Sequence, residues 1–373
     1  MGMLSYSIAD LVAPIRSKIV DRLVSEENMV ALEQLLHALP GGTSSFFGFE
    51  CDLRTPCKLD FLFCATQKEK HSSVLAGSST VSLPMEWFDD ECWKKVRQFA
   101  QAWDDENSPI FNQLENVWLE FDTSSGDPPH SPNIFFGISE EFWSSKASMG
   151  GLIGDCLDII DPSILTESVL DNLVSVVNWL PENAGVFQVG LMLARPNNQI
   201  RLCLRGLSLV QIKKLVADLN FPVNARMLQK ELSPFVGSST SVALSIDVGE
   251  KFGGKVGVEC YFGHDSETVE RVKGFLSLLD AKNMCCKETS SHLIDFHGIA
   301  HQDFETEKWP NALVDITRLM GPDTVNIIPY WLHHIKVVYE DDSDLYAKAY
   351  LAVEHHRAKR SSIAAAIRKN SST

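Results

Sequence analysis

Hydrophobic and polar residues alternate along five segments of the chain, and each segment is interrupted near its middle by Pro, Gly, Asn or Asp. β-Branched, aromatic and leucine residues at period two are typical of strands, and the interrupting residues are typical of turns. Each segment therefore predicts a β-hairpin, and five hairpins predict ten strands. The five segments are residues 46–65, 117–139, 186–206, 241–263 and 333–354.

Between the hairpins the apolar residues recur at helical spacing instead. This pattern predicts helices over residues 85–103, 166–180, 208–219, 266–279 and 313–320. Two further apolar-periodic helices are predicted within residues 8–40, and a mobile C-terminal helix or tail over residues 357–373. The stretch from 281 to 331 shows the weakest pattern.

An open antiparallel sheet of ten strands would leave two edges unpaired, and closure into a barrel removes them. The predicted helices are amphipathic, so they can cover only the outside of such a barrel. We therefore expect one α+β domain over residues 1–373, in which five hairpins form a ten-stranded antiparallel β-barrel surrounded by α-helices. Open sheets whose polar face meets bulk solvent are the alternative.

In a barrel, alternate residues of each strand face the lumen, and here the polar parity should do so. A barrel that serves only as a scaffold fills its lumen with Val, Ile and Leu. Charged groups in an enclosed lumen need charged partners or a charged ligand. The expected inward residues include Glu50, Trp118, Glu120, Phe135, Met192, Arg201, Cys203, Arg205, Lys255, Tyr261, His334, Lys336, Lys348 and Tyr350.

Composition narrows the possible partners. A net charge of −16 argues against duplex nucleic acid as a partner, and the one basic run is residues 355–369. No apolar stretch reaches the roughly 18 residues that span a bilayer, and residues 1–14 do not resemble a secretory signal. The nine cysteines include no C-x-x-C pair, which favours free thiols in a reducing compartment. We expect a cytoplasmic protein.

The order of five hairpins separated by helices, together with the chain length, resembles the ABBA-type aromatic prenyltransferases, and the indole branch in particular. The resemblance covers roughly residues 40–356 and is architectural. In that family, Lys, Arg and Tyr side chains two apart on successive strands hold an allylic diphosphate. The similar positions here are Lys348 with Tyr350, Arg201 with Arg205, Lys255 with Tyr261, and His334 with Lys336.

The resemblance implies a transferase that moves a prenyl group from an allylic diphosphate to an aromatic acceptor, either indole- or tryptophan-like or a peptide. It implies that the diphosphate is bound by Arg201, Arg205, Lys255, Tyr261, Lys336, Lys348 and Tyr350. The acceptor and the cation path would be lined by Trp118, Phe135, Met192, Cys203 and His334. Glu50 is expected to be the catalytic base, with Glu120 second. No cofactor is expected to be required, although Mg²⁺ is possible.

Several alternatives remain open at this stage. The acidic inward residues Asp52, Asp60, Asp122 and Asp247 exceed what a diphosphate site needs. They could pair with the bases, hold Mg²⁺, or indicate that the ligand is not a diphosphate. In that last case the protein would be an isomerase or cyclase that uses the acidic residues, or a non-catalytic barrel that binds a small molecule or peptide.

Individual residues also have alternative interpretations. Glu50 could instead form an ion pair with Lys58 or Arg54. The adjacent histidines at 333 and 334 are expected to point to opposite faces of a strand, so a shared metal is not expected. Cys203 and His334 could form a nucleophile pair if they share the lumen.

Overall fold

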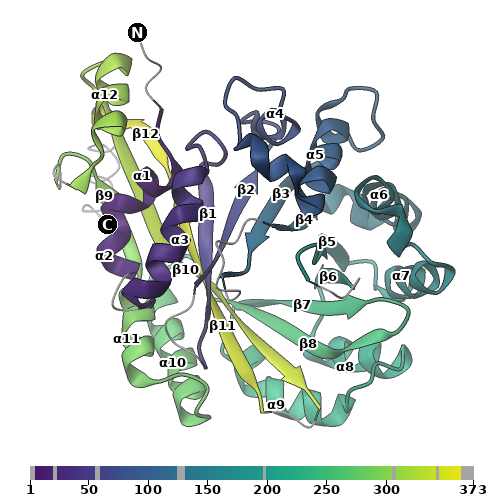
Figure 1. The fold of residues 1–373 in the computed structure, drawn as a ribbon. Helices are drawn as coiled ribbons and strands as arrows, with labels where there is room; N and C mark the ends of the chain where they lie inside the picture. Colours follow the sequence, from purple (N-terminus) through teal and green to yellow (C-terminus); the bar gives the residue numbers. More distant parts are fainter. Residues whose placement is uncertain are drawn as a thin grey trace.

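The computed structural model describes residues 5–19, 23–54, 59–123, 131–195, 199–304, 308–341 and 344–362. Ten antiparallel strands close into a barrel, and the helices form a ring around it (Figure 1). The barrel strands are β1 (Phe46–Asp52), β2 (Leu59–Ala65), β3 (Leu114–Phe121), β4 (Asn133–Ile138), β5 (Gly185–Leu191), β6 (Ile200–Arg205), β7 (Ser241–Val248), β8 (Phe252–Tyr261), β10 (Thr324–Glu340) and β11 (Tyr346–Glu354).

Closure depends on β11, which pairs with β1 on one side and with β10 on the other. In this register Glu50 lies opposite Tyr350, and Lys336 lies opposite Lys348. The remaining strands follow one another around the barrel, so each has a partner on both sides. The expected fold, a ten-stranded antiparallel barrel made of five hairpins and surrounded by helices, is confirmed.

The helices lie outside the barrel because each presents one apolar face to it. They are α1 (Ile8–Val12), α2 (Arg16–Ile19), α3 (Glu26–Ala38), α4 (His71–Ala76), α5 (Glu91–Asp104), α6 (Lys146–Ile160), α7 (Glu167–Trp179), α8 (Leu209–Asp218), α9 (Ala225–Gly237), α10 (Thr268–Ala281), α11 (Lys287–Asp295) and α12 (Asn311–Met320). Short 3₁₀ segments cover residues 13–15, 85–89, 140–144 and 162–164.

The hydrophobic core lies between the barrel wall and the helices. Phe61 and Phe63 of β2 point outward from the barrel and are fully buried. Trp93 and Phe99 of α5, in the surrounding helical layer, are fully buried as well. The outward parity is therefore apolar, as the alternation predicted. The other parity faces the lumen and carries the polar side chains described below.

The stretch with the weakest sequence pattern holds α11, α12, the short strand β9 (His297–His301) and the first half of β10. That half of β10 extends past the barrel and pairs with β9 and with β12 (His356–Lys359). The expectation of a helix or tail from residue 357 is therefore wrong for residues 357–359. These residues form a strand because the extended part of β10 offers them an unpaired edge. Residues 363–373 of the predicted tail lie outside the described residues.

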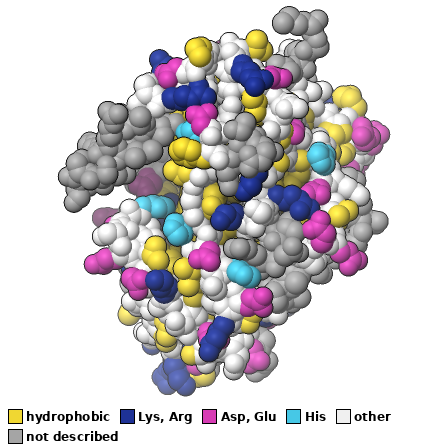
Figure 2. Space-filling model, turned by 90° about the vertical axis from the view of Figure 1, so that its left-hand side faces the viewer, with side chains coloured by type: hydrophobic (Ala, Val, Ile, Leu, Met, Phe, Trp, Pro, Cys, Tyr) yellow, Lys and Arg dark blue, Asp and Glu magenta, His cyan; other side chains and the backbone are white. Residues whose placement is uncertain are grey.

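Figure 2 shows the side of the molecule that carries α1, α2, α3 and α12. Acidic and basic side chains are interspersed over this face rather than gathered by sign. In the part of the chain that the structure describes, we find no helix with both the length and the apolar character needed to cross a bilayer.

Candidate active site

The barrel lumen contains a cavity of about 240 Å³. Its walls are mostly inward-facing residues of the strands, which is why charged and aromatic side chains from distant parts of the sequence meet there. The polar and aromatic residues that line it are Phe46, Phe47, Glu115, Asn116, Trp118, Glu120, Phe135, Phe187, Gln188, Arg201, Cys203, Arg205, Glu259, Tyr261, His333, His334, Lys336 and Tyr350.

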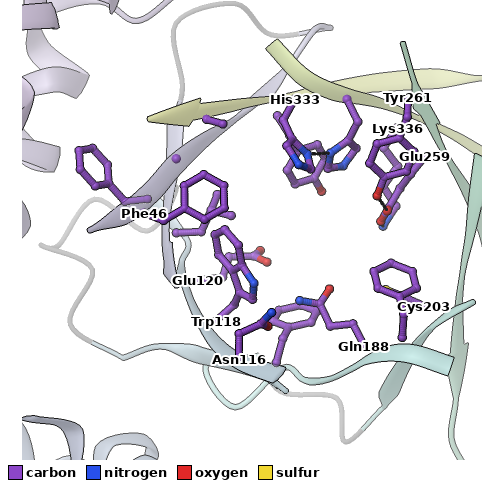
Figure 3. A pocket seen from close by; sticks show the side chains of 18 of the residues that line it. Phe46, Asn116, Trp118, Glu120, Gln188, Cys203, Glu259, Tyr261, His333 and Lys336 are labelled. Carbon is purple, nitrogen blue, oxygen red and sulfur yellow. Dashed lines mark hydrogen bonds and ion pairs between the residues drawn. The ribbon is translucent and has the colours of Figure 1, made fainter. Parts of the chain in front are cut away.

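Two opposite walls differ in chemistry (Figure 3). Lys336, Glu259, Tyr261 and His333 lie on one side, carried by β8 and β10. Trp118, Asn116 and Glu120 of β3 lie on the other side, beside Gln188 of β5. A charged wall therefore faces a wall that combines an indole ring with a carboxylate and two amides.

Most of the residues predicted from the sequence meet in this cavity. Those that line it are Trp118, Glu120, Phe135, Arg201, Cys203, Arg205, Tyr261, His334, Lys336 and Tyr350. Glu50 and Lys348 instead form an ion pair with each other. Met192 is buried just beyond the end of β5. Lys255 is half-exposed and lies 3.3 Å from a carboxylate oxygen of Glu340.

The ion pair of Glu50 and Lys348 changes the expectation for the base. Glu50 is only 4% exposed, and the Lys348 ammonium donates a hydrogen bond to its carboxylate. Burial by itself would raise the pKa of Glu50, but the charge of Lys348 and hydrogen bonds from Lys348 and Tyr350 lower it to about 2. A carboxylate held in this way is a poor proton acceptor near neutral pH. The alternative expectation for Glu50 was an ion pair with Arg54 or Lys58 rather than with Lys348. Arg54 pairs with Asp52 instead, and Lys58 lies outside the described residues.

Glu120 has the opposite electrostatic character. Burial and the nearby negative charge of Glu50 raise the pKa of Glu120 to about 7. Arg195 lies 3.2 Å from Glu120, but its guanidinium also donates to both carboxylate oxygens of Asp122, at 2.6 and 2.7 Å. Glu120 therefore lines the cavity as a carboxyl group that can release and accept a proton near neutrality.

Arg195 was not predicted from the sequence, because it stands in the turn between β5 and β6, where the alternation that assigns inward faces has ended. The alternation also predicted that Gln188 and Glu259 face inward, and both line the cavity. Asn116 and Phe187 line it as well and were not predicted from the sequence.

The other inward bases are also matched with acids. Arg201 donates to both oxygens of Asp247, at 2.8 and 3.1 Å. Lys336 donates to the Ser245 hydroxyl at 2.8 Å and lies 3.9 Å from Glu259. The acidic inward residues thus largely serve as ion-pair partners of the bases, one of the alternatives left open above.

Arg205 is the exception in this set. Its guanidinium lies 4.0 Å from the centre of the Phe187 ring and 5.5 Å from that of Tyr261. Within the described ranges, no carboxylate lies at ion-pair distance from Arg205. The same ranges hold no group of three or more His, Cys, Asp or Glu side chains arranged to bind a metal ion.

Two expectations about nucleophiles and histidines are corrected. Burial raises the pKa of Cys203 to about 12, so its thiol stays protonated and is a weak nucleophile. The pairing of β10 with β11 skips one residue between Leu332 and His334, which is a β-bulge. The bulge turns both His333 and His334 toward the cavity, rather than toward opposite faces. Residues 330–336, around the bulge, contain no Gly or Pro that would indicate it.

Comparison with known proteins supports the fold but no sequence family. No protein-family model matches the chain, and no curated protein matches it. The solved structure of the prenyltransferase PriB in its apo form is 12% identical, with a TM-score of 0.52, over 93% of this chain and 96% of that one. The binary complex of PriB with product diphosphate gives 13% identity, a TM-score of 0.51, and coverage of 94% and 96%. The solved structure of the 5-dimethylallyltryptophan synthase from Streptomyces coelicolor is 11% identical, with a TM-score of 0.48, over 92% of this chain and 95% of that one.

The chain therefore has the fold of the ABBA-type prenyltransferases, as its pattern of hairpins and helices indicated. At 12 and 13% identity, the similarity to the PriB structures shows this architecture alone.

Proposed function

We propose that this protein transfers a prenyl group from an allylic diphosphate to an aromatic acceptor inside the barrel. The observation that carries the proposal is one cavity, in a prenyltransferase fold, where Lys336 and Tyr261 face Trp118 and the buried carboxyl group of Glu120, and which Arg205 also lines. Transfer needs a site for a leaving anion, a site for a flat acceptor and a group that takes a proton.

The diphosphate would lie against Arg205, Lys336 and Tyr261. Arg205 supports this assignment most directly, because no carboxylate of the described residues competes for its guanidinium. Negative charge builds up on the diphosphate as its bond to the prenyl carbon breaks, so donors fixed beforehand on this wall stabilise the transition state. Tyr261 and Tyr350 offer π faces that shield the allylic cation.

The acceptor would lie between the aromatic residues on the opposite side. Phe46 and Trp118 are in edge contact, with ring centres 5.2 Å apart, and Phe135 lines the same part of the lumen. In the reaction the prenyl carbon–oxygen bond breaks, a bond from the acceptor to that carbon forms, and the acceptor loses a proton. Glu120 would accept this proton, because it lines the cavity and its pKa is near 7. Glu50 has neither property.

A thermal-shift screen tests the ligand class. Dimethylallyl, geranyl and farnesyl diphosphate should each be titrated with and without Mg²⁺, because binding to the folded state raises its stability by mass action. We expect a saturable shift with at least one of them. Mass spectrometry of tryptophan, indole and a tryptophan-containing peptide, incubated with the binding diphosphate, should then show one added prenyl unit. No shift with any of the three diphosphates would contradict the proposal.

One observation favours a second candidate. The pairs Arg201–Asp247 and Lys336–Glu259 leave little net positive charge on the cavity wall. This balance suits an uncharged ligand, held by an isomerase or cyclase or by a non-catalytic binding barrel. Mass spectrometry of the compound after incubation with the protein separates the candidates. Transfer adds the mass of a prenyl group to the acceptor. An isomerase or cyclase changes the structure of its substrate at constant mass, and simple binding changes neither the mass nor the structure of the ligand.

A further inference from the structure

The two cavity histidines are joined by one hydrogen bond, because the Nδ1 atoms of His333 and His334 lie 2.7 Å apart. One Nδ1 must donate and the other must accept, so a single proton occupies this bond. A further proton can be added only on an Nε2 atom, which turns one ring into an imidazolium and preserves the bond. A second added proton would place two N–H groups head to head. The pair can therefore take up one proton and no more.

The other ring nitrogen of His334 lacks a partner. His334 is only 8% exposed, and its Nε2 is buried without a hydrogen bond to any of the described residues. The ring is stacked on Tyr350, with centres 4.2 Å apart, and lies 5.1 Å from the ring of Tyr261. Buried polar atoms are nearly always hydrogen-bonded. This nitrogen, on a side chain that lines the cavity, therefore points to a bound ligand that completes it.

The groups around the pair come from every neighbouring element, and most are cationic or neutral. They are Arg205 of β6, Glu259 and Tyr261 of β8, His264 after β8, Lys336 of β10, and Tyr350 of β11. Burial and Arg205 lower the pKa of His333 to about 4, and burial also lowers the pKa of His334. Without an anion nearby, both rings are neutral at pH 7.

An anion in the cavity reverses this balance, since negative charge beside a buried imidazole favours its protonated form. Lys336 cannot supply all the compensating charge, because Glu259 lies 3.9 Å from it. A proton taken up by the histidine pair would supply the difference. The pair thus offers a positive charge that exists only while the anion is bound.

We propose that the His333–His334 pair is a proton-coupled anchor for a phosphate-type anion. In the bound state, Nε2–H of His334 donates to an anion oxygen, and the pair holds one proton taken from solvent. No covalent bond changes in this step, and the proton returns to solvent when the anion leaves. The inference rests on the proposed function for the identity of the anion as a diphosphate, and it deepens that proposal.

Isothermal titration calorimetry of the full chain tests the anchor. Inorganic pyrophosphate and sulfate are titrated in buffers of different ionisation enthalpy, which reports the protons taken up on binding. Sulfate keeps its charge between pH 5 and 8, so any pH dependence of its affinity arises from titrating groups of the protein. We expect uptake approaching one proton, with sulfate affinity falling by up to about tenfold per pH unit as pH rises from 6 to 8. Glu120 lines the same cavity with a pKa of about 7 and could also take up a proton when an anion binds, so a variant has to assign the uptake to the histidines.

The double variant His333→Asn with His334→Gln assigns the proton, because either imidazole left alone could still be protonated beside an anion. Both replacements keep a polar side chain that does not titrate, so the double variant should lose the proton uptake that the pair contributes and show a flatter pH dependence. His37→Asn is the matched control, because His37 is exposed on α3 and lies outside the lumen. It should retain the wild-type uptake. Circular dichroism melts establish that each variant is folded.

The outcomes separate the two proposals. Anion binding without proton uptake, or with the same uptake in the double variant, overturns the anchor and leaves prenyl transfer standing. Uptake that depends on His333 and His334, without transfer to any acceptor, supports the anchor and contradicts the transfer. If pyrophosphate, sulfate and all three prenyl diphosphates fail to bind at any pH, both proposals are contradicted.

Discussion

The ammonium group of Lys348 donates to the carboxylate of Glu50 diagonally across the β1–β11 pair, in which Glu50 is directly opposite Tyr350. The resemblance to the prenyltransferases implied that Lys348 is one of the phosphate ligands and that Glu50 is the catalytic base. Because Glu50 and Lys348 are paired with each other, the groups that remain available for chemistry in the lumen are Glu120, Arg205 and the histidine pair.

The first prediction concerns the stability provided by this ion pair. Glu50→Gln leaves Lys348 charged and largely buried without its partner. Breaking a buried pair typically costs about 3 to 5 kcal/mol, and we expect the free energy of unfolding to fall by about that amount. Urea denaturation measures it. Replacing both residues, as in Glu50→Gln with Lys348→Met, should recover most of the loss. A single variant as stable as the wild type would contradict the role of the pair.

The second prediction assigns the base. Glu120→Gln preserves the shape of the side chain but cannot accept the acceptor's proton, so turnover should fall by about 10²- to 10⁴-fold. Turnover of the wild type should rise with pH and level off above about 7, because only ionised Glu120 accepts a proton. Glu115→Gln is the control, since Glu115 is an exposed residue of the same cavity. Normal turnover in Glu120→Gln would move the base elsewhere.

The third prediction follows from the same carboxyl group without any substrate. The pKa of Glu120 is raised from its ordinary 4.5 to about 7, so the folded state retains a proton that the unfolded state releases between these values. Its contribution to stability is therefore fully present below about pH 4.5 and is lost as the pH rises through 7. Melting temperatures at pH 5, 6, 7 and 8 should fall less steeply in Glu120→Gln than in the wild type. Parallel curves would show that Glu120 titrates normally.

The fourth prediction compares two basic residues that were both expected to bind phosphate. Arg205→Ala removes the cavity cation that no described carboxylate neutralises. Pyrophosphate affinity should weaken by about ten- to a hundredfold, the value of one or more hydrogen bonds to a charged group. Lys255→Ala should change the affinity by less than about twofold, because a half-exposed lysine paired at the surface contributes little. Calorimetry measures both. Equal losses would return Lys255 to the site.

Much of the architecture follows from the sequence alone. Period-two alternation separates Phe47 and Phe49 from Glu50, and the same rule holds around the barrel because burial of one strand face is a local requirement. The five hairpins and the inward parity of Arg205, Tyr261 and Lys336 could therefore be predicted from the sequence. Of the helices between the hairpins, α5, α7, α8, α10 and α12 were predicted, whereas α4, α6, α9 and α11 were not.

The partners of those inward residues could not be predicted in this way. Glu50 and Lys348 are 298 positions apart, and closure of the barrel alone sets the register that joins them. Arg195 reaches Glu120 and Asp122 from a turn, where no periodicity assigns a direction. The bulge at His333 depends on how β10 fits against β11, since the local residues permit a regular strand.

Local patterning therefore determined which side chains enter the lumen, because facing inward or outward depends on one strand and the solvent on either side of it. Tertiary structure decided which carboxylate meets which base, and so which groups stay available for chemistry. Those contacts are set by the stagger of strands distant in sequence, and their electrostatics depend on burial that exists only once the barrel has closed.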